Sequence, residues 1–214
     1  MLIRSRPRRV ALMLTLGAVG GASLGLVARV ALGDGEGRRP TLPGLHGQAT
    51  WAASKQLAPQ VRLRDQNGAI VSLGALRGRP VLVTFLDSKC VEQCPVAGRQ
   101  LGTMLRGMAP ADRPALVIVS VDPADDTPES TRQAMRDWRL AGPWRWHWLR
   151  GSRSELARVW AAYGIAVQPT TNDVTHGLAL YLVDRRGFQR TGYLFPFLPN
   201  FVALDLRTLA NERA

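Results

Sequence analysis

Cysteine is scarce in this chain of 214 residues, and its two cysteines, Cys90 and Cys94, lie close together. With Pro95 they form a Cys-x-x-x-Cys-Pro motif. A disulfide between them would close a very short loop, and the stabilisation that a disulfide gives grows with the length of the loop. A purely structural bridge is therefore disfavoured. We expect a reactive pair, which is either a redox dithiol or two soft ligands for one metal ion.

Lysine is just as scarce, since Lys55 and Lys89 are the only two, and arginine carries the formal net charge of +12. So basic a chain raises the possibility of nucleic-acid binding. The sequence lacks zinc-finger spacing, a basic helix and a stripe of arginines interleaved with aromatic residues. We therefore expect a solvated basic surface and no nucleic-acid partner.

Charge of either sign is missing from Val10 to Ala28, a run about as long as the roughly 20 residues that span a bilayer. The alternative is a cleaved signal peptide, whose apolar region is shorter, about 7–15 residues. Under the positive-inside rule, residues 1–9 stay in the cytoplasm and residues 10–32 form a single-pass membrane anchor. The rest of the chain then lies on the extracytoplasmic (periplasmic) side, where disulfides persist unless they are reduced. Four arginines precede the run: Arg4, Arg6, Arg8 and Arg9.

Glycines recur every four residues within the apolar run, at Gly17, Gly21 and Gly25. This spacing permits close packing of a second helix and hence a homodimer in the membrane. Residues 33–54 are rich in Gly, Pro and small polar residues, which predicts a flexible linker with His46 as an exposed linker histidine. The remaining residues, 55–214, are expected to form one domain without internal repeats.

Strands and helices alternate in this domain, which predicts an α/β fold with a central mixed sheet flanked by helices. Its opening and closing hairpins, with paired thiols straight after the first central strand, are typical of a thioredoxin-like fold. The expected strands are 61–63, 70–73, 81–86, 115–121, 144–148, 177–183 and 188–194, and the expected helices begin at 95, 128, 152 and 200.

The cysteine motif lies between a buried strand and a helix. If Cys94 is the N-cap and Pro95 the first helical residue, the helix dipole and Lys89 both favour the thiolate form of Cys94. In a thioredoxin-like fold, the segment that ends in His176 lies opposite this helix, so His176 is the third candidate site residue. His147 sits in an alternating strand pattern and is predicted to be a structural histidine. The carboxylates around Thr127, the expected N-cap of the next helix, are explained by capping and solvation.

Five segments follow one another along the chain: Val83-Thr84-Phe85, Cys90-x-x-x-Cys94-Pro95, Ser120-Val121-Asp122-Pro123, Asp126-Thr127-Pro128-Glu129, and His176 before Leu180-Tyr181-Leu182-Val183-Asp184. In this order they resemble the Sco/SenC family of membrane-tethered copper chaperones for cytochrome c oxidase assembly. The resemblance implies that Cys90, Cys94 and His176 bind copper. Two thiolates and an imidazole suit Cu(I), Cu(II) would need a further ligand, and zinc is a chemical alternative. The implied acceptor is the CuA centre of cytochrome c oxidase subunit II or another extracytoplasmic copper protein, and a thiol reductant is a further implied partner.

The chain departs from the family pattern next to the candidate ligands. Val91 stands where the family usually has Pro, Gly177 replaces a usual Ser, and Leu86-Asp87-Ser88 replaces an aromatic-Thr pair. A second hypothesis therefore stays open, in which Cys90 and Cys94 are the catalytic pair of a thiol–disulfide oxidoreductase that reduces the acceptor's cysteines. A peroxidase on the same fold is a third, but no dedicated peroxidatic motif is present.

Overall fold

The computed structural model describes residues 44–170 and 174–212. The predicted cytoplasmic segment 1–9, the predicted anchor 10–32 and its three glycines lie outside the described residues. Within the two described ranges, no helix is long and apolar enough to cross a membrane. The described residues from Leu45 onward belong to one compact unit.

A mixed six-stranded sheet organises this unit, with strand order β1-β10-β9-β4-β5-β6. β4, β5 and β6 are parallel, whereas β9 is antiparallel to β4, and β10 and β1 continue the antiparallel part. The predicted opening hairpin is present as a separate pair, β2 with β3, and β7 with β8 forms another. The strands are β1 (Ala49–Thr50), β2 (Arg62–Arg64), β3 (Ile70–Ser72), β4 (Val81–Leu86), β5 (Ala115–Ser120), β6 (Trp146–Leu149), β7 (Val167–Pro169), β8 (Val174–His176), β9 (Ala179–Val183) and β10 (Gln189–Leu194).

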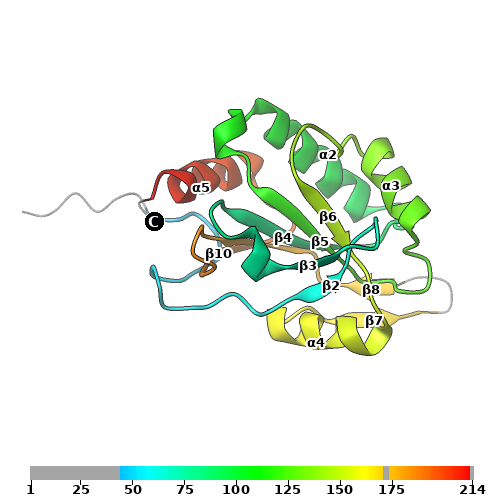
Figure 1. Cartoon of the computed structure of the whole chain (residues 1–214). Helices are drawn as coiled ribbons and strands as arrows, with labels where there is room; N and C mark the ends of the chain where they lie inside the picture. Colours follow the sequence, from blue (N-terminus) through cyan, green and yellow to red (C-terminus); the bar gives the residue numbers. More distant parts are fainter. Residues whose placement is uncertain (1–43, 171–173, 213–214) are drawn as a thin grey trace, which may run out of the picture. The chain divides into compact units, whose positions relative to one another are not determined.

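Helices cover both faces of the sheet (Figure 1). The helices α2, α3 and α5 share one apolar core with one face of the sheet, and α4 shares the second core with the other face and the β2–β3 hairpin. The predicted α/β arrangement with a central mixed sheet is thus confirmed. The helices are α2 (Gln93–Gly107), α3 (Pro128–Asp137), α4 (Arg153–Tyr163) and α5 (Pro199–Asn211), with short 3-10 turns η1 (Leu73–Leu76) and η2 (Pro110–Asp112).

The sequence explains why these elements form where they do. All residues of β4 and β5 are buried, as expected for uninterrupted apolar runs in the middle of a parallel sheet. Thr127 and Ser152 cap α3 and α4 through reciprocal side-chain and backbone hydrogen bonds, so the predicted cap at Thr127 is confirmed. Gly164 ends α4 with φ at +69°, a left-handed conformation that glycine adopts without steric cost.

The predicted linker over residues 33–54 is wrong for the residues from Leu45 onward. Leu45 packs against the apolar core, and β1 pairs with β10 to form the edge of the sheet. Gly47 lies so close to β10 that a Cβ atom would come within 2.2 Å of the Thr191 hydroxyl. The glycine that suggested flexibility in the sequence is therefore required by this close approach.

His46 is exposed, as predicted, but it is not part of a flexible linker. Its backbone N–H donates to Asp205 Oδ2 at 2.8 Å, its Nδ1 lies 2.6 Å from Asp205 Oδ1, and its ring stacks on Phe201. Asp205 is only 1% exposed and also accepts a hydrogen bond from the hydroxyl of Tyr193. This buried carboxylate of α5 holds the start of the domain against its last helix.

We predict that Asp205→Ala lowers the free energy of unfolding by about 3 kcal/mol, because it leaves the Tyr193 hydroxyl buried without its acceptor and frees His46. Urea unfolding of the domain measures this change. Asp137→Ala, at an exposed position on α3, is the matched control and should shift stability by less than about 0.5 kcal/mol. Equal effects of the two substitutions would contradict the assigned role of Asp205.

Candidate metal and redox site

The loop that carries the cysteines leaves the carboxyl end of β4 and enters α2. The helix begins at Gln93 with Glu92 at the N-cap position, so Cys94 is the second helical residue and Pro95 the third. The prediction that Cys94 caps the helix and Pro95 starts it is therefore wrong by two residues. Proline fits anywhere in the first turn, because the N–H groups of that turn have no partner within the helix.

A buried carboxylate fixes the conformation of this loop. Asp126 Oδ1 accepts a hydrogen bond from the Ser88 N–H at 2.8 Å, and Asp126 Oδ2 accepts one from Trp148 Nε1 at 3.3 Å. The Ser88 hydroxyl also donates to the Ser130 hydroxyl oxygen of α3 at 2.8 Å. Burial raises the pKa of Asp126, and the hydrogen bonds that it accepts oppose that shift. The loop is thus anchored to β6 and α3 just before the first cysteine.

The imidazole of His176 is delivered to the same place by the β7–β8 hairpin, in which His176 pairs with Val167. The His176 Nδ1 lies 3.1 Å from the carbonyl oxygen of Gly177, which favours the tautomer with its proton on Nδ1. The other ring nitrogen, Nε2, lies 3.7 Å from Cys94 Sγ. The fold therefore brings together two residues that are 82 positions apart in the chain.

A pocket of about 170 Å³ contains all three candidate residues, Cys90, Cys94 and His176. Cys94 is 1% exposed, Cys90 is partly exposed, and both are free thiols. In the described part of the chain, however, no three His, Cys, Asp or Glu side chains are already grouped closely enough to hold a metal ion. The other lining residues are Val91, Glu92, Gln93, Val174, Thr175 and Leu178.

The two thiols have opposite acidities. Burial alone would raise the pKa of Cys90. A hydrogen bond from the Cys94 thiol has a larger, opposite effect, and together with the backbone N–H groups of residues 92–94 it lowers the pKa of Cys90 to about 5. The same hydrogen bond and the burial of Cys94 raise its own pKa. The prediction that the helix start favours the Cys94 thiolate is therefore wrong, and Cys90 receives that stabilisation. Cys90 is the thiolate at neutral pH, and Cys94 is its proton donor.

Asp87 is a site neighbour to which the sequence pattern had assigned no role. It is buried at the end of β4, and its Oδ1 accepts a hydrogen bond from the Lys89 N–H at 2.7 Å. Burial raises its pKa to about 7, and the charges of Asp126, Asp122 and Cys90 act in the same direction. The available signal was a carboxyl directly after a mostly apolar strand. Such a position places the carboxyl at the end of a buried strand in the middle of the sheet.

The other two histidines lie outside this pocket. His147 is in β6, and its Nδ1 lies 3.0 Å from Asp65 Oδ2, so the prediction of a structural strand histidine is confirmed. His46 contacts α5, as described above. Of the three histidines in the chain, His176 is therefore the one that meets the cysteines.

Known proteins share both the sequence pattern and the fold. The SCO1/SenC family matches residues 50–211. A protein of Stutzerimonas stutzeri that bears the name copper-binding protein is 31% identical over 140 residues, which span 62% of this chain and 66% of that relative. Copper-bound ScoI of Bradyrhizobium japonicum is 28% identical, with a TM-score of 0.60 over 72% of this chain and 99% of its own.

A SCO1/SenC family lipoprotein of Bacillus anthracis has the same fold at 22% identity, with a TM-score of 0.64 over 75% of this chain and 100% of its own. These structural matches confirm the predicted thioredoxin-like architecture for the described domain.

We predict that alkylation of the reduced, metal-free protein modifies Cys90 long before Cys94. The thiolate is the reacting species, so the rate at Cys90 should fall to half only when the pH drops to about 5. Iodoacetamide labelling from acidic to neutral pH, followed by peptide mass spectrometry, measures both rates. A half-maximal rate near the ordinary cysteine pKa of about 8.5 would contradict the assigned acidity.

Proposed function

Because this chain belongs to the SCO1/SenC family, we propose that it is a copper-binding chaperone that holds copper through Cys90, Cys94 and His176. The observation that carries the proposal is the meeting of Cys94 and His176 beside Cys90 in one pocket. Copper-bound ScoI, with 28% sequence identity, supports the choice of metal. Two sulfurs and one imidazole nitrogen are a soft donor set, which suits Cu(I).

The spacing of the two fixed donors suits a metal ion. Metal–sulfur and metal–nitrogen bonds of about 2.3 Å and 2.0 Å, at angles of about 109–120°, would place the two donor atoms about 3.5–3.7 Å apart. Cys94 Sγ and His176 Nε2 lie 3.7 Å apart. The hydrogen bond from Nδ1 to the Gly177 carbonyl also turns the lone pair of Nε2 toward the sulfur.

Cys90 is the adjustable member of the set. It lies in the loop before α2 and is partly exposed, whereas Cys94 is buried within the helix. In our proposal, Cys94 and His176 form the fixed half of the site, and the Cys90 thiolate closes on the ion. Cys90 is then also the first thiolate ligand to exchange with a thiolate of the acceptor, because it is more accessible than Cys94.

The proposed acceptor is the CuA centre of cytochrome c oxidase subunit II or another extracytoplasmic copper protein. Anchoring of residues 10–32 in the cell membrane would keep the domain on the periplasmic side, near such an acceptor. Copper binding requires both cysteines to be reduced, so the proposal includes a thiol reductant as a second partner.

A thiol–disulfide oxidoreductase is the alternative, and the acidity of Cys90 specifically favours it. A thiolate next to a protonated thiol is the arrangement that attacks a disulfide and then resolves the mixed disulfide. Both functions use the same reduced dithiol, and His176 separates them, because dithiol exchange does not need an imidazole ligand.

We predict that the reduced domain, from about residue 39, binds one Cu(I) ion without oxygen. Cys90→Ser and Cys94→Ser should abolish tight binding, because each removes a thiolate ligand. Competition with a chromogenic Cu(I) chelator measures the affinity. His147→Ala is the matched control, since that histidine lies outside the pocket and should leave the affinity unchanged. Stoichiometric copper in both serine variants would refute the ligand assignment.

We further predict that His176→Ala weakens Cu(I) binding at least tenfold, about 1.4 kcal/mol, but leaves the dithiol able to form and reduce its disulfide. Glutathione redox buffers give the reduction potential, which should stay within about 30 mV of the parent protein. A variant that keeps full copper affinity would remove His176 from the site. Loss of dithiol exchange would instead assign the imidazole to the redox reaction.

A further inference from the structure

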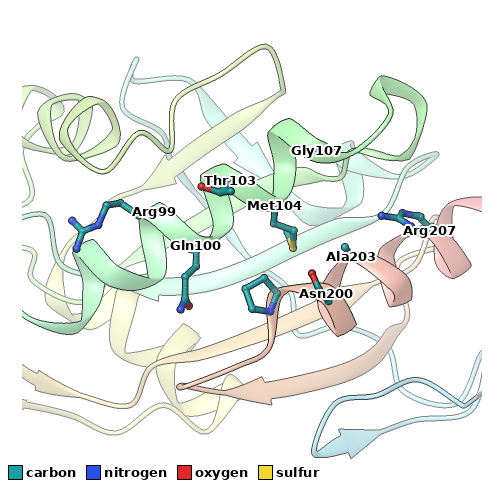
Figure 2. Close-up of a pocket in the computed structure, with 9 residues that line it drawn as sticks. Arg99, Gln100, Thr103, Met104, Gly107, Asn200, Ala203 and Arg207 are labelled. Carbon is teal, nitrogen blue, oxygen red and sulfur yellow. The ribbon is translucent and has the colours of Figure 1, made fainter.

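A second hollow on this domain lies away from the cysteines, between α2 and α5. It has a volume of about 530 Å³, within the range of about 300–1,000 Å³ that is usual for ligand sites. Figure 2 shows the two helices side by side with the lining residues between them. Arg99, Gln100, Thr103, Met104 and Gly107 come from α2, and Pro199, Asn200, Ala203 and Arg207 from α5.

The charges of this groove have one sign. Arg99 and Arg207 lie at its opposite ends (Figure 2), and the lining includes no carboxylate. The ion pairs found in the described residues involve neither arginine. Two guanidinium groups are thus available at fixed ends, each able to bind a carboxylate through two parallel hydrogen bonds.

The surface between the arginines is more apolar than polar. Met104, Pro199 and Ala203 contribute to it, and Gly107 leaves room. The apolar character continues along both helices. Val96 lies one turn before Gln100 and is 38% exposed, and Leu204 lies one turn after Asn200 and is 44% exposed. A ligand that fits must therefore combine an apolar middle with acidic ends.

Polar groups within the groove identify the ligand further. Thr103 and Asn200 place hydrogen-bonding side chains in its lining. A peptide backbone has both N–H and C=O groups to pair with them, whereas a simple dicarboxylate has acceptors alone. We propose that the groove is a docking site for an acidic peptide segment of a partner protein, with apolar side chains between two carboxylates.

The lengths agree with this proposal. Residues 99 and 107 are about 12 Å apart along the axis of α2, at about 1.5 Å per residue. The first and last residues of an extended pentapeptide lie about 13 Å apart, at about 3.3 Å per residue. A segment with glutamates at both ends and leucines inside them is thus about as long as the α2 wall of the groove.

The test uses the full chain in neutral detergent and a fluorescein-labelled, end-blocked peptide, Glu-Leu-Ala-Leu-Glu, with fluorescence anisotropy as the readout and empty micelles as the blank. We expect saturable binding that R99Q and R207Q each weaken about fivefold, because each removes one charged pair. A203L should weaken it about tenfold by filling the groove. R153Q, which removes an exposed arginine of α4, is the matched control and should leave the affinity unchanged.

Three results would overturn the proposal. They are the absence of saturable binding at millimolar peptide, an equal loss in R153Q, and equal binding of Glu-Ser-Ala-Ser-Glu. The last two would reduce the interaction to unspecific charge attraction. Arg99 and Arg207 are exposed, so R99Q and R207Q retain the fold and decide the question even if A203L does not fold.

Discussion

The candidate site depends on one buried carboxylate, that of Asp126. Three segments that are distant in the sequence meet at this residue: the loop after β4 through Ser88, β6 through Trp148, and its own turn between β5 and α3. Burying a carboxylate is costly unless hydrogen bonds satisfy it, and two N–H donors do so here. Because Ser88 lies two residues before Cys90, this interaction fixes where the sulfur loop starts and, with it, where α2 begins.

That constraint divides the site into a fixed half and an adjustable half. Cys94 is held by α2 and His176 by a paired strand, so the distance between their donor atoms is set by the fold. Cys90 lies between the anchored Ser88 and the helix and keeps partial exposure. The same position directs the backbone N–H groups of the helix start at its sulfur, which makes Cys90 the more acidic thiol. Accessibility and reactivity thus coincide in one residue.

The sequence predicted what local patterns determine. The apolar runs of β4 and β5 predicted buried strands, and the predicted cap at Thr127 follows from local hydrogen bonds. The proximity of His176 to Cys94 followed only once a fold was assumed, because 82 residues separate them.

The predictions that were wrong concern features that depend on contacts between distant residues or on the exact geometry of a helix start. β1 and His46 looked like linker because their partners are distant in the sequence. β1 pairs with β10, and His46 contacts Asp205, 159 residues away in the chain. The start of α2 was misplaced because Pro95 fits any position of a first turn. The prediction of which thiol is more acidic was wrong, because the pKa values depend on which sulfur faces the helix N-terminus. The spacing of the two cysteines in the sequence does not give that orientation.

Helix α2 connects the candidate metal site with the proposed docking groove. Its first turn holds Cys94, and its outer face supplies one wall of the groove. Arg99 lies five residues after Cys94, about 7.5 Å along the helix axis at about 1.5 Å per residue. A continuous helix transmits position over such a length without bending. A segment bound between Arg99 and Arg207 would therefore hold its protein at a defined distance from the sulfurs, so the orientation of a docked partner and its access to Cys90 are set by the same helix.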